Sequence, residues 1–96
     1  MYTYTFKNGD VVTSKLEKEE LLKRMERLDT LRVLTEGYDD GIGLNIFKKA
    51  VKAYNKTHDF TGIIRLTSTE KEFLGYMLES DFNSEEDIEV LNFYIR

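Results

Sequence analysis

The first residues of the chain alternate aromatic and polar side chains, the pattern of a β-strand with one buried face. Strand-favouring residues return at positions 11–13, after Asn8-Gly9. Asn-Gly favours a two-residue type I′ turn, because both residues tolerate the positive φ that this turn requires. We therefore expect a β-hairpin that pairs Phe6 with Val11. Its buried face then carries Tyr2, Tyr4, Phe6 and Val11.

Apolar residues recur at helical spacing between positions 21 and 28, with charged residues between them, which predicts an amphipathic helix. Ser14 and Glu17 have the spacing of a capping box, in which each side chain accepts a hydrogen bond from a backbone N–H at the helix start. We expect this helix to end near residues 29–30. Residues 31–35 then read as a short β-like stretch, with a brief helical turn as the alternative.

The middle of the chain predicts a loop, a helix, a strand and a further helix. Three glycines within residues 37–43 indicate the loop, and apolar spacing predicts a helix from residue 44 or 45 to residues 55–57. Residues 61–67 are typical of a strand. Two overlapping capping-box spacings, Thr67 to Glu70 and Thr69 to Glu72, predict the start of the next helix.

The C-terminal residues fit two kinds of element. Ser84 and Asp87 could cap another helix, whereas residues 89–95 alternate as a strand would. We favour the strand. The 96 residues are then expected to form a single α+β domain, residues 1–96, with an N-terminal hairpin and a small, mostly antiparallel sheet of about four to five strands packed against three amphipathic helices.

The amino-acid composition excludes several kinds of functional site. Without cysteine the chain has no disulfide, no thiolate zinc site and no thiol nucleophile. No apolar stretch has membrane-spanning length, and the first residues do not resemble a signal peptide. We expect no metal, no cofactor and no membrane contact, and a cytoplasmic location, which is the host cytoplasm if a phage encodes the chain.

Charge is unevenly distributed along the sequence. Residues 1–71 carry a net charge of +2, whereas residues 72–96 carry −6. One interpretation is a solvated helix start, where carboxylates are favourable. The other is a surface that binds a basic protein partner through electrostatic attraction. The residues expected to contact that partner are Tyr76, Glu79, Asp81, Phe82, Glu85, Glu86, Asp87 and Glu89.

Four lysines form a stripe on the second expected helix. Clustered ammonium groups of this kind bind phosphate backbones, which makes a small nucleic-acid-binding or regulatory module the alternative function. The acidic net charge of −4 and the lack of arginine or aromatic residues in the stripe favour an ordinary solvated helix face instead. A basic stripe and an acidic surface could also meet in a homo-oligomer. The stripe comprises Lys48, Lys49, Lys52 and Lys56.

Two further features invite a chemical interpretation. His58 beside Asp59 could form an oriented base, but the sequence offers no serine in a nucleophile-elbow context, so a turn histidine is favoured. The glycine-rich loop at 37–43 lacks the spacing of a phosphate-binding motif, and its two aspartates fall short of a calcium ligand set. We expect a non-enzymatic protein.

The chain contains no proline and is rich in lysine, asparagine, isoleucine, tyrosine and phenylalanine, a bias that AT-rich codons produce. In size, acidity and codon bias it resembles small accessory proteins of phages and mobile elements, among them anti-CRISPR inhibitors. This resemblance covers composition alone. It implies a stoichiometric inhibitor that blocks a host nucleic-acid-handling enzyme.

Overall fold

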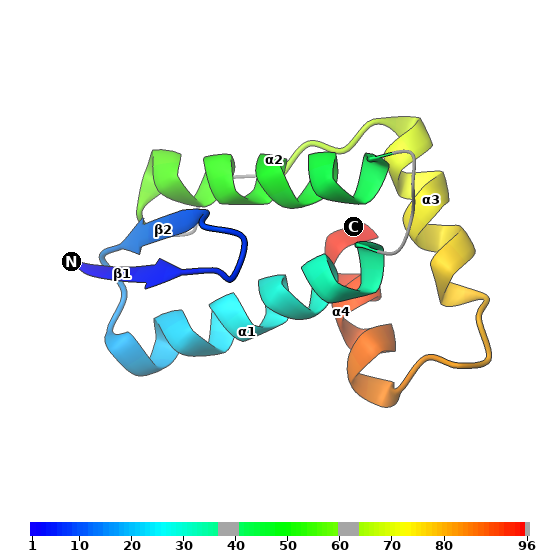
Figure 1. The fold of residues 1–96 in the computed structure, drawn as a ribbon, viewed down its shortest axis with the longest axis horizontal. Helices are drawn as coiled ribbons and strands as arrows, with labels where there is room; N and C mark the ends of the chain where they lie inside the picture. Colours follow the sequence, from blue (N-terminus) through cyan, green and yellow to red (C-terminus); the bar gives the residue numbers. More distant parts are fainter. Residues whose placement is uncertain (37–40, 60–63, 96) are drawn as a thin grey trace.

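The computed structural model describes residues 1–36, 41–59 and 64–95, which form four helices and one two-stranded antiparallel sheet. The hairpin lies at one end of the molecule, with β1 on the side of α1 and β2 on the side of α2, while α3 and α4 lie at the other end (Figure 1). The elements are β1 (Tyr2–Thr5), β2 (Val11–Ser14), α1 (Lys18–Thr35), α2 (Ile42–Thr57), α3 (Ser68–Leu78) and α4 (Glu85–Ile95).

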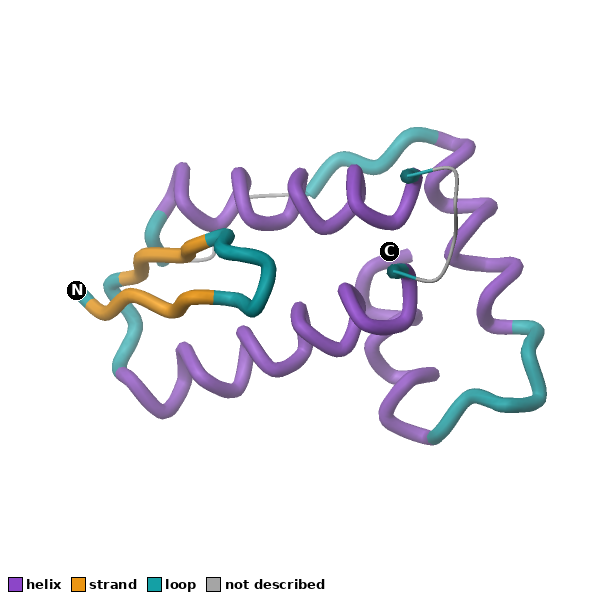
Figure 2. The backbone as a smooth tube through the Cα atoms, viewed as in Figure 1, coloured by secondary structure: helices purple, strands orange, loops and turns teal. Residues whose placement is uncertain are grey.

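The prediction of an α+β fold with an N-terminal hairpin is confirmed, but the expected four to five strands and three helices are wrong. Figure 2 shows how little of the described backbone is strand. Residues 31–35 continue α1, because Leu28, Leu31 and Thr35 keep the helical spacing and are all buried. The β-like stretch and the expected helix end near residues 29–30 are therefore both wrong, because α1 continues without a break to Thr35.

The expected C-terminal strand is a helix. Ser84 Oγ accepts a hydrogen bond from Asp87 N, and the Asp87 carboxylate accepts one from Ser84 N, each at 3.1 Å. This reciprocal pair satisfies backbone groups at the start of α4. Val90, Leu91 and Tyr94 are buried at helical spacing, which outweighs the alternation at residues 91, 93 and 95.

A strand was expected at residues 61–67, but residues 64–67, the described part of this range, form no strand. Residues 61–63 lie outside the described residues. So do residues 37–40 of the expected loop, whereas the remainder of that loop leads directly into α2.

The hairpin turn at Asn8-Gly9 is one residue longer than expected. Only Gly9 has positive φ, at 92°, so the two-residue type I′ turn does not form. Gly9 N instead donates to Phe6 O at 3.0 Å, and Phe6 N donates to Asp10 O at 2.8 Å. This pattern matches the three-residue loop that ends on a left-handed glycine.

The longer turn shifts the strand register by one residue, so that Tyr4 pairs with Val12. Because side chains alternate between faces, the shift replaces Val11 with Val12 on the buried face. Val12 and Phe6 are buried, whereas Tyr2 and Val11, both expected inside, are exposed. The Phe6 ring packs edge to face on Phe47 of α2, with the ring centroids 5.0 Å apart.

Besides the Ser84–Asp87 pair, one of the other three expected capping boxes forms and two do not. Thr67 and Glu70 exchange the two expected hydrogen bonds at the start of α3, which leaves no such role for Thr69 and Glu72. The Ser14 box is wrong because α1 begins at Lys18 after Glu17, which makes no side-chain cap bond. Ser14 is fully buried at the end of β2 instead.

Asn55 of α2 occupies the outer edge of β2. Its Nδ2 donates to Val11 O and its Oδ1 accepts from Thr13 N, both at 2.8 Å. One side-chain amide thereby makes the two backbone hydrogen bonds that a neighbouring strand would make.

His58 continues this contact just beyond the end of α2. Its left-handed backbone, with φ 59°, turns its carbonyl toward the hairpin, where it accepts hydrogen bonds from Lys15 N at 2.6 Å and from Ser14 Oγ at 2.8 Å. Its Nδ1 donates to Thr13 O at 2.9 Å. We call these contacts of Asn55 and His58 with residues 11–15 the α2–β2 clasp.

The clasp yields a stability prediction. Asn55→Ala should lower the free energy of unfolding by about 1–3 kcal/mol, because it leaves the Val11 carbonyl and the Thr13 N–H without their partner. Asn45→Ala is the matched control, since Asn45 is an exposed asparagine of the same helix with no hydrogen bond from its side chain among the described residues. Urea denaturation of both variants checks this, and an equal change in the two would contradict a structural role for Asn55.

A second prediction concerns the close approach of α1 and α2. A Cβ at Gly43 would overlap Thr35 Cβ, so Gly43→Ala should destabilise the protein by about 1–3 kcal/mol. Gly75→Ala in α3 meets nothing within 4 Å and should instead stabilise by about 0.5–1 kcal/mol through helix propensity. Thermal denaturation should move the two midpoints in opposite directions.

Candidate functional site

The acidic segment lies at the end of the molecule opposite the hairpin (Figure 1). It runs from the end of α3 through the connection at residues 79–84 into the first turns of α4. All the residues expected to contact a partner are exposed except Asp87, which is partly buried. The structure therefore brings most of the expected site to one region of the surface.

Two aromatic side chains stand out in this region. Phe82 is 97% exposed and Tyr76 is 70% exposed, among the largest values for apolar side chains of the described residues. Burial of a phenylalanine contributes roughly 1.5–3 kcal/mol, and in Phe82 this contribution is unused. The Phe82 ring therefore offers apolar area that contact with another molecule would bury.

Hydrogen bonds hold the connection that presents Phe82. Asn83 Nδ2 donates to Met77 O at 2.8 Å, and Phe82 N donates to Ser80 Oγ at 3.3 Å. On the far side of Asn83 the Ser84–Asp87 cap fixes the start of α4. None of these bonds uses the Phe82 ring, so the ring is free to contact a partner from a backbone that is already ordered.

The carboxylates of the acidic segment differ in their interaction partners. Asp87 caps α4 and is structural. Glu86 and Glu89 border a groove whose other side is α1. The side chains of the remaining three make no hydrogen bond or ion pair within the described part of the chain: Glu79, Asp81 and Glu85.

The groove between α1 and α4 has a volume of about 600 Å³ and mixed charge. Lys23, Arg24 and Arg27 of α1 line it together with Glu86 and Glu89. The guanidinium of Arg27 lies over the Phe93 ring, 4.3 Å from its centroid. Glu20 and Glu26 of α1 line the groove as well, so its charges are mixed, whereas the carboxylates of Glu79, Asp81 and Glu85 have no cation paired with them in the described part of the chain.

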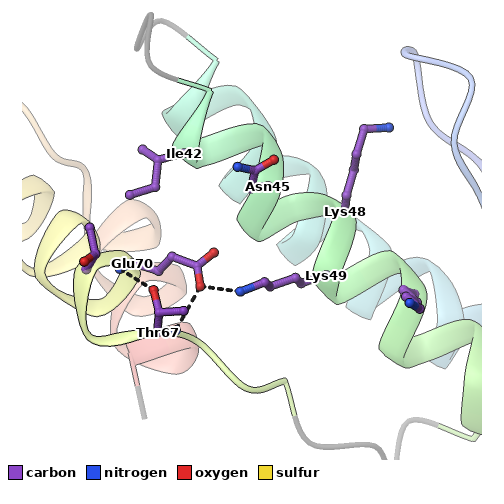
Figure 3. Close-up of a pocket in the computed structure, with 8 residues that line it drawn as sticks. Ile42, Asn45, Lys48, Lys49, Thr67 and Glu70 are labelled. Carbon is purple, nitrogen blue, oxygen red and sulfur yellow. Dashed lines mark hydrogen bonds and ion pairs between the residues drawn. The ribbon is translucent and has the colours of Figure 1, made fainter.

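The lysine stripe on α2 is partly neutralised within the molecule. Lys49 Nζ lies 2.5 Å from Glu70 Oε1, as Figure 3 shows, and Lys48 Nζ lies 3.5 Å from Asp10 Oδ2. Lys52 and Lys56 are exposed, with no such pairing in the described residues. The cavity beside the stripe holds about 530 Å³ and is bounded by the start of α3.

Glu70 is the acidic residue that sequence reasoning did not connect to the stripe. Its spacing from Thr67 identified it as a capping residue, but nothing in the sequence placed it beside Lys49, 21 positions away. Glu70 is 5% exposed. Burial raises the pKa of its carboxyl, but hydrogen bonds from Lys49 and Thr67 outweigh burial and the net pKa is lowered.

The other candidate groups have structural partners or lie outside the described residues. Both the ring and the carbonyl of His58 belong to the α2–β2 clasp, in agreement with a turn histidine. Asp39 and Asp40 lie outside the described residues. In the parts of the chain that are described, no three histidine, aspartate or glutamate side chains come together as a metal site.

Comparison with known proteins gives no further guide, because no family model, curated protein or solved structure matches this chain. In the described ranges, no helix combines the length and apolarity needed to cross a membrane.

The Lys49–Glu70 pair predicts a pH dependence of stability. Because the folded pKa of Glu70 lies below its ordinary value of 4.5, the pair stabilises the fold above about pH 4.5, and this stabilisation is lost as pH falls through the folded pKa. Glu70→Gln should therefore lower the free energy of unfolding at pH 7 by about 1 kcal/mol and have less effect at low pH. Glu72→Gln, at an exposed position of the same helix, is the control. A pH-independent difference between Glu70→Gln and the unsubstituted protein would contradict the assignment.

Proposed function

We propose that this protein is a non-enzymatic binding module that docks its acidic surface on a basic protein partner. The observation that carries the proposal is the 97% exposure of Phe82 on a hydrogen-bonded connection flanked by unpaired carboxylates. An apolar anchor surrounded by charge has the composition of an interface with a hot spot and a polar rim. The partner then offers an apolar pocket bordered by lysine or arginine.

A nucleic-acid-handling enzyme is the class of partner that this chemistry fits. Grooves that bind nucleic acid are lined by cationic side chains, and an acidic protein surface can occupy such a groove. Blocking the groove inhibits the enzyme without any catalysis by the inhibitor. The compositional resemblance to phage and mobile-element accessory proteins supports an inhibitor of this kind, in the manner of anti-CRISPR proteins.

The lysine stripe receives less support as a nucleic-acid site. Two of its four ammonium groups already contact carboxylates, which leaves Lys52 and Lys56 to bind a phosphate backbone. Non-specific affinity for nucleic acid grows with the number of phosphates neutralised, so two lysines give weak binding.

Charge reversal tests the proposal. The unsubstituted protein should retain a basic protein from lysate of the source organism at low salt. Asp81→Lys with Glu85→Lys should abolish this retention, and Phe82→Ala should weaken it. These substitutions spare Asp87, which caps α4. Once purified, the retained protein should bind less tightly at higher salt, because the attraction is screened, and calorimetry at two salt concentrations measures this.

The control carries the same charge change at the other end of the molecule. Glu17→Lys with Glu19→Lys makes the same change of charge at two exposed positions around the start of α1. This control should retain the partner. If all variants retain the same proteins with the same salt dependence, the acidic surface is not the binding site.

A further inference from the structure

A cavity of about 380 Å³ lies at the C-terminal end of α3, beside the connection that carries Phe82. The described residues that line it are Tyr76, Met77, Glu79 and Ser80. Small-ligand pockets hold roughly 300–1,000 Å³, so this cavity is at the lower end of their range. Its size suits a single side chain of another molecule.

Two side chains that line the cavity are available for contact. Glu79 keeps helical backbone angles, φ −76° and ψ −9°, and its N–H donates to Tyr76 O at 3.2 Å. Residues three apart in such a turn are neighbours on the helix surface. Tyr76 is 70% exposed and Glu79 is also exposed. Within the described part of the chain, neither side chain has a hydrogen bond, an ion pair or a ring contact.

The electrostatics of the cavity favour a cationic occupant. The C-terminal end of a helix carries partial negative charge, and α3 has no basic residue in its last turn to offset it. Residues 72–95 contain no lysine or arginine, and no described residue that lines the cavity is basic. The Glu79 carboxylate and the aromatic ring of Tyr76 are two further groups that attract positive charge.

We propose that this cavity binds the guanidinium group of an arginine on the basic protein partner, with the Tyr76 ring as its stacking surface and Glu79 as its ion-pair partner. This inference rests on the proposed function, in which such a partner docks on the acidic surface. Arginine fits better than lysine, because a planar guanidinium stacks on aromatic rings, forms two parallel hydrogen bonds with a carboxylate and is more weakly hydrated than an ammonium. The chain itself contains a contact of this kind, where the Arg27 guanidinium lies over the Phe93 ring.

Ser80 connects the cavity to Phe82. Its Oγ accepts a hydrogen bond from Phe82 N at 3.3 Å, and its N–H donates to Met77 O at 3.2 Å. The cavity and the Phe82 anchor therefore lie on one continuous, hydrogen-bonded segment. The partner then presents an arginine beside the apolar pocket that takes Phe82, and these two contacts together set its orientation.

Two peptides of equal length and charge test the proposal without the partner. N-acetylated, C-amidated hexa-arginine and hexa-lysine are titrated into the protein at about 20 mM salt, where screening is weak. Calorimetry gives the two affinities, and their ratio is the arginine preference. We expect hexa-arginine to bind about 2- to 5-fold more tightly than hexa-lysine, which is the range of a cation–π contact at an exposed site. Backbone amide NMR should show shifts at residues 76–80 that are larger with hexa-arginine.

Substitutions in the cavity should remove the preference while keeping most of the general attraction. Tyr76→Leu should bring the two affinities to within error of each other, whereas Tyr76→Phe, which keeps the ring, should retain the preference. Tyr2→Leu is the matched control, since Tyr2 is an exposed tyrosine at the opposite end of the molecule. Far-UV circular dichroism checks that every variant folds.

The carboxylate is tested in the same way. Glu79→Gln should reduce the arginine preference. Glu72→Gln removes the same charge from another exposed position of α3 and should leave the preference unchanged.

The outcomes separate this inference from the proposed function. Equal affinity of the two peptides for the unsubstituted protein, or a preference that survives Tyr76→Leu, overturns the arginine site and leaves the acidic surface as a docking surface. Asp81→Lys with Glu85→Lys should weaken both peptides and keep their ratio. If this double variant binds both peptides as tightly as the unsubstituted protein, the acidic surface is contradicted, whereas a preference that still depends on Tyr76 supports the arginine site.

Discussion

An isolated two-stranded sheet is only marginally stable in water, so the hairpin of this protein depends for its stability on the helices that contact it. The α2–β2 clasp is the contact on which this dependence rests. A single asparagine amide takes the place of a neighbouring strand, and the carbonyl of a left-handed histidine receives two further hydrogen bonds. With its outer edge satisfied, β2 can turn Val12 and Ser14 into the interior beside the helices. The end of α2 thus holds the hairpin in position, while the three-residue turn sets which face is buried.

Two buried tyrosines connect the other half of the molecule to the same helix. The hydroxyls of Tyr54 and Tyr94 lie 3.1 Å apart and join α2 to α4. Burial raises the pKa of both phenols, so they remain neutral and hydrogen-bonded. The C-terminal turn of α2 therefore contacts the hairpin through Asn55 and α4 through Tyr54. The acidic surface, at the start of α4, lies at the end of the molecule opposite the hairpin (Figure 1).

The sequence predicted those elements whose local signals agree with one another. The hairpin, α2 and α3 each combine consistent periodicity with a turn or cap, and all three are present. Predictions failed where two periods competed. Residues 89–95 fit both a strand and a helix, and only burial of Val90, Leu91 and Tyr94 against the rest of the core distinguishes them. The acidic surface was predictable because charge and exposure follow from residue type, whereas the neutralisation of Lys48 and Lys49 by distant carboxylates was not.

By itself the sequence determined the class of the fold, the presence of a turn at Asn8-Gly9 and the location of most of the charge, since these depend on residue type and short-range spacing. Tertiary structure decided the role of Ser14, because its hydroxyl bonds the carbonyl of His58, 44 residues away. It decided as well what covers the outer edge of β2, because Asn55 lies 42 residues from Thr13. It also decided that Phe82 is left outside the core while Phe6 and Phe47 fill it. The type of a residue determines how hydrophobic its side chain is, but only the packing of the helices decides whether water or protein surrounds that side chain.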